Sequence, residues 1–181
     1  VSLKDGGETK KMSKRAGNVI LLEDLVDEFG IDVVRWFFSD KALTTHMEFD
    51  TALAREQSEK NPVYYVQYAH ARIESIKRNT TDVPKDDTHI LDTFSAPSAR
   101  NLAYLITEFP EIVLGVADTY HVHALPTYAY RLATAFSAFY HDVRILDEGM
   151  CHAGARSLAE AAGETIKQTL ALLGISAPER M

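Results

Sequence analysis

Apolar residues recur at helical spacing along most of the chain after residue 20. One clear stripe, at intervals of three and four, consists of Val63, Val66, Ala69, Ile73 and Ile76. Asn61 and Pro62 come directly before it, and these residue types suit the N-cap and the first helical position. The pattern therefore predicts a helix from Pro62 to about Arg78 with one face turned toward a core.

Further helices are expected on both sides of this one. Including it, they cover residues 23–29, 33–38, 51–60, 62–78, 98–109, 110–117, 127–146 and 153–173. Asp32 and Asp50 are expected to cap the helices that follow them. Gly30 and Gly174 are expected to end the helices that precede them. Residues 79–91 are polar and are expected to form an exposed loop.

No alternation of apolar and polar residues is long enough to predict a substantial β-sheet. The fold class expected is therefore all-α. It is a helical bundle of five or six main helices from about residue 50, preceded by a smaller stem segment that is partly helical. A chain of 181 residues is long enough to bury a sizeable core.

Composition indicates the class and cellular location of the protein more than its fold. With 46% apolar and 25% charged residues, the chain is typical of globular proteins. Its single cysteine, Cys151, excludes an internal disulfide framework, and no apolar run approaches the roughly 20 residues of a membrane span. We therefore expect a cytoplasmic protein without a membrane partner. Because the first residue is Val1, we interpret the chain as processed or, preferably, as a piece of a longer protein.

The formal net charge of −7 argues at first against a nucleic-acid partner. The charge is unevenly distributed, however, because Val1–Arg15 carries a net charge of +3 and Gln57–Asn79 one of +2. An acidic protein can bind RNA through a local basic face, where stacking and hydrogen bonds to base edges supply specificity.

The first basic segment contains two lysines and a serine in a glycine-containing loop, Lys11-Met12-Ser13-Lys14. Ammonium groups neutralise phosphate oxygens, and the hydroxyl and backbone amides donate hydrogen bonds, so such a loop can bind polyphosphate. Composition alone favours a solvated basic loop, since basic surface clusters are common.

The order of residues in this loop resembles the K-M-S-K signature of class I aminoacyl-tRNA synthetases. Four further stretches resemble the arginyl-tRNA synthetase family in particular. They lie at 16–38, 49–72, 125–146 and 172–181, and the most specific parts are N-P-V-Y-Y-V-Q-Y-A-H-A-R at 61–72 and the ending A-P-E-R-M at 177–181.

The resemblance implies a fragment in two parts. Residues 1–48 would be the end of a catalytic region with the signature loop and stem, and residues 49–181 a DALR-type anticodon-binding bundle. The full-length parent would form arginyl-adenylate from arginine and ATP with Mg, and transfer arginine to tRNA(Arg). The nucleotide-binding fold with its His-Ile-Gly-His signature is missing from these residues, so the fragment is expected to be inactive alone. We also expect it to bind no cofactor and to be monomeric.

Within the loop, the resemblance implies that Lys14 is the catalytic contact to the ATP phosphates. Lys11 and Ser13 would assist it. The seven histidines and Cys151 show no spacing typical of a metal site, so no metal is expected.

Tyr65, Tyr68 and Arg72 share one face of the helix that begins at Pro62. Aromatic rings with a guanidinium can stack unpaired bases and bond their edges, although half-buried packing explains the tyrosines equally well. The resemblance implies that this helix faces the tRNA anticodon loop and that Tyr68 and Arg72 contact its bases. Gln67 is a further polar candidate nearby.

A second candidate pair, Tyr140 and Arg144, stands at i and i+4 on the helix expected over 127–146. Tyr140 could equally belong to a core cluster with Phe136 and Phe139. Met181 has a thioether that can stack against a base, and we expect it to be ordered beside the tyrosine helix.

Two other functions remain open from the sequence. A helical protein-interaction module without an RNA role is favoured by the acidic net charge and disfavoured by the Tyr–Arg face. The C-terminal region of another class I synthetase, such as a cysteinyl relative, shares the loop but is disfavoured by the A-P-E-R-M ending.

Overall fold

The computed structural model describes residues 2–5, 8–11, 21–79, 90–147 and 150–181. Its first part is a small mixed unit. In chain order it consists of β1 (Ser2–Asp5), β2 (Glu8–Lys11), α1 (Leu22–Phe29), α2 (Ile31–Ser39), β3 (Glu48–Asp50) and α3 (Thr51–Arg55). The strands form one sheet in the order β2-β1-β3, in which β1 runs antiparallel to β2 and parallel to β3.

This N-terminal unit has a core of its own. Phe49 of β3 is fully buried, and its ring lies 5.2 Å from the rings of Phe29 and Phe37 (centroid distances). The other buried members are Leu3, Leu25, Val34, Met47 and Ala54. The cluster thus uses residues on either side of the predicted division between residues 48 and 49, and that division stays a prediction.

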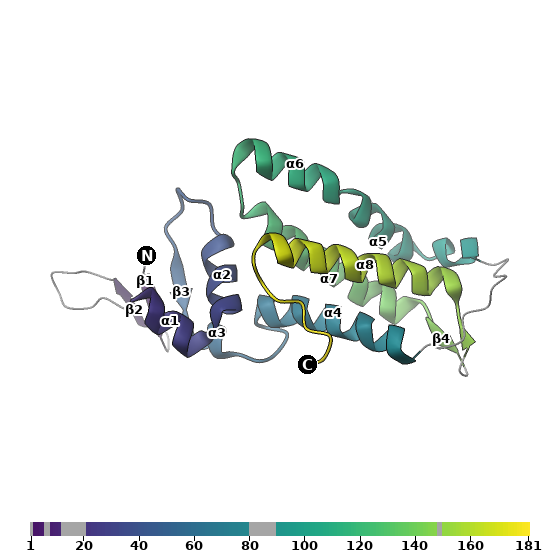
Figure 1. The fold of residues 1–181 in the computed structure, drawn as a ribbon, viewed down its shortest axis with the longest axis horizontal. Helices are drawn as coiled ribbons and strands as arrows, with labels where there is room; N and C mark the ends of the chain where they lie inside the picture. The colour runs from purple at the N-terminus through teal and green to yellow at the C-terminus, as the bar shows by residue number, and fades with distance from the viewer. Residues whose placement is uncertain (1, 6–7, 12–20, 80–89, 148–149) are drawn as a thin grey trace.

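The rest of the chain is a helical bundle. Its helices are α4 (Pro62–Asn79), α5 (Pro97–Thr107), α6 (Phe109–Thr119), α7 (Ala124–Asp142) and α8 (Ala153–Leu172). A 3-10 helix, η2 (Ile90–Ser95), precedes α5, and a short hairpin of β4 (Leu146–Asp147) and β5 (Met150–Cys151) joins α7 to α8. Helices α4, α7 and α8 pack on one another, and the N-terminal unit lies at one end of the bundle (Figure 1).

The bundle core confirms the apolar stripe of α4. All five of its predicted members are buried: Val63, Val66, Ala69, Ile73 and Ile76. Helix α8 approaches this stripe closely at Gly163, where a Cβ atom would lie only 2.8 Å from Cγ2 of Ile73. The close packing of α4 and α8 therefore depends on a residue without a side chain at this position.

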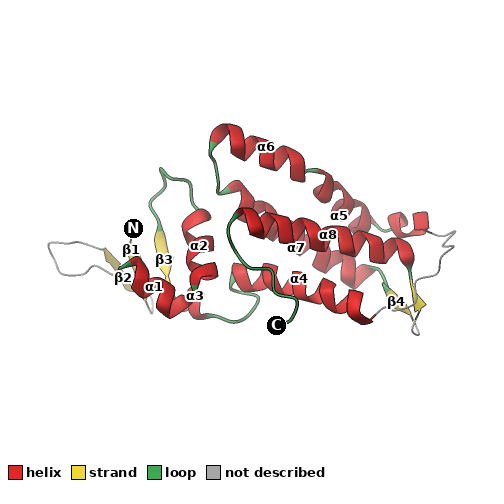
Figure 2. Ribbon diagram, in the orientation of Figure 1, coloured by secondary structure: helices red, strands yellow, loops and turns green. Residues whose placement is uncertain are grey.

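The predicted all-α fold is confirmed, and Figure 2 shows how far helix dominates the molecule. Its short strands, of two to four residues, were not predicted from the sequence. Helix α3 is shorter than predicted, ending at Arg55, and α7 ends at Asp142, where Val143 turns into extended backbone.

The predicted caps have mixed outcomes. Asp50 caps α3 by accepting a hydrogen bond from the Leu53 N–H, and Asn61 caps α4 by accepting from the Val63 N–H. Asp32 does not cap α2, because that helix already begins at Ile31 and Gly30 is its N-cap. The Asp32 carboxylate is used instead by a distant segment of the chain.

That segment is the C-terminal tail, which runs back along α4 after Gly174 (Figure 1). Gly174 has a φ of +67°, a conformation in which glycine has no steric cost. The Ser176 N–H and hydroxyl both donate to Asp32, and Gln67 Nε2 donates to Asp32 and to the Ser176 carbonyl oxygen. Polar groups of two helices, α2 and α4, therefore fix the start of the tail.

Two residues of α4 hold the tail further along. His70 is buried, and its Nδ1 donates to the Pro178 carbonyl oxygen at 2.9 Å, since a carbonyl can only accept. Arg78 donates to the Glu179 carbonyl oxygen at 3.0 Å. These bonds bring the last residues, Arg180 and Met181, beside α4.

In the described part of the chain, no helix has both the length and the apolar character needed to cross a membrane.

Candidate nucleic-acid interface

The face of α4 that points away from the core carries aromatic and cationic side chains. The Asn61 cap fixes where α4 begins. Because one stripe of the helix is buried in the core, the residues on its opposite side face outward. Tyr68 is 43% exposed. Its ring lies parallel to that of Tyr64, one turn earlier, with a centroid distance of 6.4 Å and an interplanar angle of 6°.

Arg72 lies between two tyrosine rings. Its guanidinium carbon is 5.3 Å from the ring centroid of Tyr68 and 4.5 Å from that of Tyr140 on α7. Both distances fall within the range of cation–π attraction. The two rings therefore hold the guanidinium in place from two helices.

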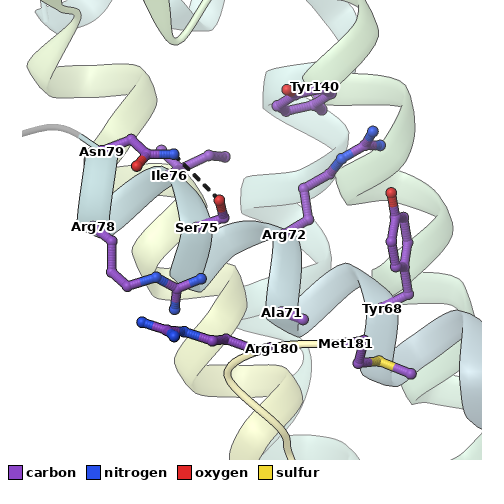
Figure 3. Close-up of a pocket in the computed structure, with 10 residues that line it drawn as sticks. All are labelled: Tyr68, Ala71, Arg72, Ser75, Ile76, Arg78, Asn79, Tyr140, Arg180 and Met181. Atoms are coloured by element: carbon purple, nitrogen blue, oxygen red, sulfur yellow. Dashed lines mark hydrogen bonds between the residues drawn. The ribbon is translucent and has the colours of Figure 1, made fainter.

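These residues line an open hollow of about 430 Å³, here called the Arg72 hollow (Figure 3). Its lining comes from α4, α7 and the tail, and comprises Tyr68, Ala71, Arg72, Ser75, Ile76, Arg78, Asn79, Tyr140, Arg180 and Met181. Three of the ten side chains are arginines, and none is an aspartate or glutamate. In Figure 3, Arg78 and Arg180 lie next to each other on one side, while Met181 lies near Tyr68.

The chemistry of this hollow suits a ligand that is planar and rich in acceptors. Guanidinium and amide N–H groups donate to carbonyl oxygens, ring nitrogens and phosphate oxygens, and tyrosine rings stack against flat groups. No side-chain carboxylate lines the hollow, so its three guanidinium groups favour a ligand with acceptor atoms or negative charge. An unpaired nucleotide combines these ligand properties.

Four of the residues singled out from the sequence meet at the Arg72 hollow: Tyr68, Arg72, Tyr140 and Met181. Met181 is 51% exposed and lies beside the tyrosine helix, as expected. Tyr65, in contrast, turns toward α7, where its hydroxyl donates to Ser137 and its ring lies 5.1 Å from that of Tyr130.

Gln67 and Arg144 lie elsewhere. Gln67 holds the C-terminal tail through the bonds described above. Arg144 was expected on one helix with Tyr140, but α7 ends two residues before it because Val143 is extended. Arg144 instead lines a separate hollow with Asp92, Asp142 and His152.

The basic signature loop cannot be compared with its prediction. Ser13 and Lys14 lie outside the described residues, as do the side chain of Lys11 and most of the predicted loop 79–91. Among the residues that are described, no three His, Cys, Asp or Glu side chains gather as metal ligands would.

Sequence reasoning missed Arg78, Asn79 and Arg180 as members of the hollow. The net positive charge of residues 57–79 was a usable signal for Arg78. Nothing local could have indicated Arg180, because its position depends on the tail folding back over more than 100 residues of sequence.

Comparison with known proteins places this geometry in a family. Residues 66–181 match the family described as the DALR anticodon binding domain. The whole chain aligns with arginine–tRNA ligases of Geobacter metallireducens, at 43% identity, and Moorella thermoacetica, at 42%. It covers 33% of each, so the chain spans about a third of the length of the curated relatives it matches.

Solved structures agree with the sequence comparison. A Campylobacter jejuni protein described as an arginyl tRNA synthetase superposes with a TM-score of 0.81 at 30% identity, covering 99% of this chain and 39% of that one. Thermus thermophilus arginyl-tRNA synthetase gives a TM-score of 0.68 at 27% identity, covering 93% of this chain and 29% of that one. The family match spans well over half of the chain, including every residue of the Arg72 hollow, and the chain therefore belongs to the DALR anticodon binding domain family.

Proposed function

We propose that this chain is the tRNA-binding part of an arginine–tRNA ligase and binds the anticodon loop of tRNA(Arg) at the Arg72 hollow. The observation that carries the proposal is the guanidinium of Arg72 held between Tyr68 and Tyr140 in a hollow without acidic side chains. A protein-interaction module without an RNA role is not favoured, because the matched family is an anticodon-binding one.

The middle base of the anticodon is the proposed occupant. Every arginine codon has guanine in its second position, so the middle anticodon base is always cytosine. Cytosine presents a carbonyl oxygen and a ring nitrogen as acceptors, to which Arg72 can donate, while Tyr68 supplies a stacking surface. Uracil has an N–H in place of that ring nitrogen, so two donors would face each other and binding would weaken.

The C-terminal tail completes the site in this proposal. Gln67, His70 and Arg78 fix the backbone of the tail, which sets Met181 beside Tyr68. Backbone carbonyl groups near the end of the tail can accept from the cytosine amino group, which the arginines cannot do.

For the longer parent we propose the reaction that the name of the relatives states, which is the ligation of arginine to tRNA. ATP and Mg would take part in the activation step. Lys14 would contact the ATP phosphates, assisted by Lys11 and Ser13, in a segment 1–48 that ends the catalytic region. Residues 49–181 would then serve tRNA binding in a cytoplasmic, monomeric enzyme. The K-M-S-K order and the likeness to arginine–tRNA ligases support this part of the proposal.

A binding experiment with short RNA hairpins tests the proposal. We expect a hairpin with the arginine anticodon to bind the 181-residue chain, and Tyr68→Ala to weaken binding about 5- to 150-fold through loss of one stacked base. Arg72→Ala should also reduce the preference for cytosine over uracil at the middle position. Affinity can be measured by fluorescence anisotropy, and folding by circular dichroism.

Tyr104→Ala is the matched control, because Tyr104 is 63% exposed on α5 and does not line the Arg72 hollow. It should leave hairpin affinity unchanged. The proposal fails if Tyr68→Ala and Arg72→Ala both fold normally and both bind the hairpin as well as the unsubstituted chain does.

A further inference from the structure

A second hollow, of about 420 Å³, shares Tyr68 and Arg72 with the first. We call it the Glu59 hollow. Its remaining lining residues are Glu59, Tyr64, Tyr65, Ser137 and His141. The two hollows meet at the same pair of side chains. A chain-like ligand with one unit in the Arg72 hollow can therefore place the adjoining unit in the Glu59 hollow.

The two hollows differ in charge and in hydrogen-bonding character. The Arg72 hollow is lined by three arginines and no side-chain carboxylate, whereas the Glu59 hollow has one carboxylate on its rim. A carboxylate repels phosphate and accepts hydrogen bonds from N–H groups. The parallel rings of Tyr64 and Tyr68 offer the Glu59 hollow a flat aromatic border. Such a site suits a base with an N–H on its edge better than a phosphate group.

The backbone that carries Glu59 is held firmly. Glu59 lies in a turn closed by a hydrogen bond from the Asn61 N–H to the Ser58 carbonyl oxygen at 3.0 Å. The buried side chain of Asn61 also donates to the carbonyl oxygens of Ala54 and Glu56. Within the described part of the chain, no hydrogen bond or ion pair is found for the exposed Glu59 carboxylate. The turn therefore sets where Glu59 leaves the backbone, and its carboxylate is exposed to a ligand.

We infer that the Glu59 hollow receives the third anticodon base and that Glu59 accepts a hydrogen bond from the ring N–H of that base. The inference rests on the proposed function, since it assumes the middle base in the Arg72 hollow. Neighbouring bases of a single strand are one nucleotide apart, which matches two hollows that share Tyr68 and Arg72.

The genetic code limits which bases the Glu59 hollow would have to accept. Arginine codons begin with cytosine or adenine, so the third anticodon base is guanine or uracil. Both of these bases carry an N–H at the centre of their pairing edge, whereas adenine and cytosine carry an unprotonated ring nitrogen there. A carboxylate accepts from the first pair and repels the lone pair of the second. The first anticodon base varies much more among arginine codons, and a fixed acceptor would reject some of its forms.

Glu59→Gln tests the inference, because glutamine keeps the shape but removes the charge and adds an amide donor. The probes are four hairpins with cytosine in the middle of the anticodon and G, U, A or C as its third base. We expect the unsubstituted chain to bind the G and U hairpins about 5- to 50-fold more tightly than the A and C hairpins. In Glu59→Gln this preference should fall to less than about 2-fold, with A and C hairpins bound no more weakly than before.

Glu56→Gln is the matched control, because Glu56 is an exposed neighbour in sequence that does not line the Glu59 hollow. It should keep the full preference for G and U. If the hairpins bind with the middle-base preference intact but are indifferent to the third base, the inference is wrong and the proposed function stands. If none of the four hairpins binds, the proposed function itself fails. A preference that survives in Glu59→Gln would also overturn the inference.

Discussion

Tyr128 and Tyr68 show how the interior and the outer surface of this bundle use the same side chain differently. Tyr128 of α7 is 1% exposed, its ring packs near Phe109, and its hydroxyl donates to the Leu105 carbonyl oxygen at 2.8 Å. Tyr68 is 43% exposed, and its ring lies near the ring of Tyr64 and the guanidinium of Arg72. The interior satisfies its polar atoms within the protein, whereas the outer surface arranges rings and donors that a ligand can use.

Helix α4 carries both kinds of position. Ile73 lies on the buried side against Gly163, while Arg72, the preceding residue, lies on the outer side between two tyrosines. Stability and binding should therefore separate cleanly along this one helix. Substitutions in the core test this separation, beginning with the one that should lower stability most.

Ile73→Ala should lower the free energy of unfolding by about 2–5 kcal/mol, because it leaves a cavity between α4 and α8 in a fully buried part of the core. Urea denaturation followed by circular dichroism measures this loss. The folded fraction should still bind the arginine hairpin with unchanged affinity. A large loss of affinity per folded molecule, or a destabilisation under about 1 kcal/mol, would contradict the assignment of this face to stability.

Tyr128→Phe should have a smaller effect, about 1 kcal/mol, since it removes one buried hydrogen bond and keeps the ring. Burial raises the pKa of Tyr128 to about 12. The unfolded chain therefore releases this proton near pH 10 while the folded chain retains it, so the contribution is complete below pH 10 and is lost as the pH rises toward 12.

The pH dependence can be isolated by comparing denaturation curves of the two proteins between pH 9 and 12. The unsubstituted chain should lose stability more steeply than Tyr128→Phe over the upper part of this range. Parallel curves would mean that the Tyr128 hydroxyl ionises as readily in the folded state as in the unfolded state.

The sequence allowed the helices and their buried faces to be predicted where the signals are local. The stripe of α4, its Asn61 cap and the closing Gly174 depend on residues a few positions apart, and all three occur as predicted. The strands of the N-terminal unit were missed because stretches of three or four residues are too short to show alternation. The pairing of β1 with β3 also joins segments that are distant along the chain.

The candidate site also contains some residues that local sequence signals could identify and others that they could not. Tyr68 and Arg72 could be identified from their helical spacing, and their shared face is observed. The position of Gln67 could not be anticipated, since it bonds Ser176 across more than 100 residues of sequence, and neither could the bond from the Ser176 N–H to Asp32. Arg144 was misplaced because the end of α7 at Asp142 has no glycine or proline to mark it.

The most direct test of the central claim is photocrosslinking of an arginine hairpin that carries 5-iodocytosine as its middle anticodon base. The crosslinked protein can be digested and the modified peptide identified by mass spectrometry. The account predicts a crosslink to the lining of the Arg72 hollow, above all to Tyr68, Tyr140 or Met181, and its loss when unlabelled hairpin competes. Specific crosslinking confined to a surface away from this hollow, such as the exposed side chains of α6, would contradict the account.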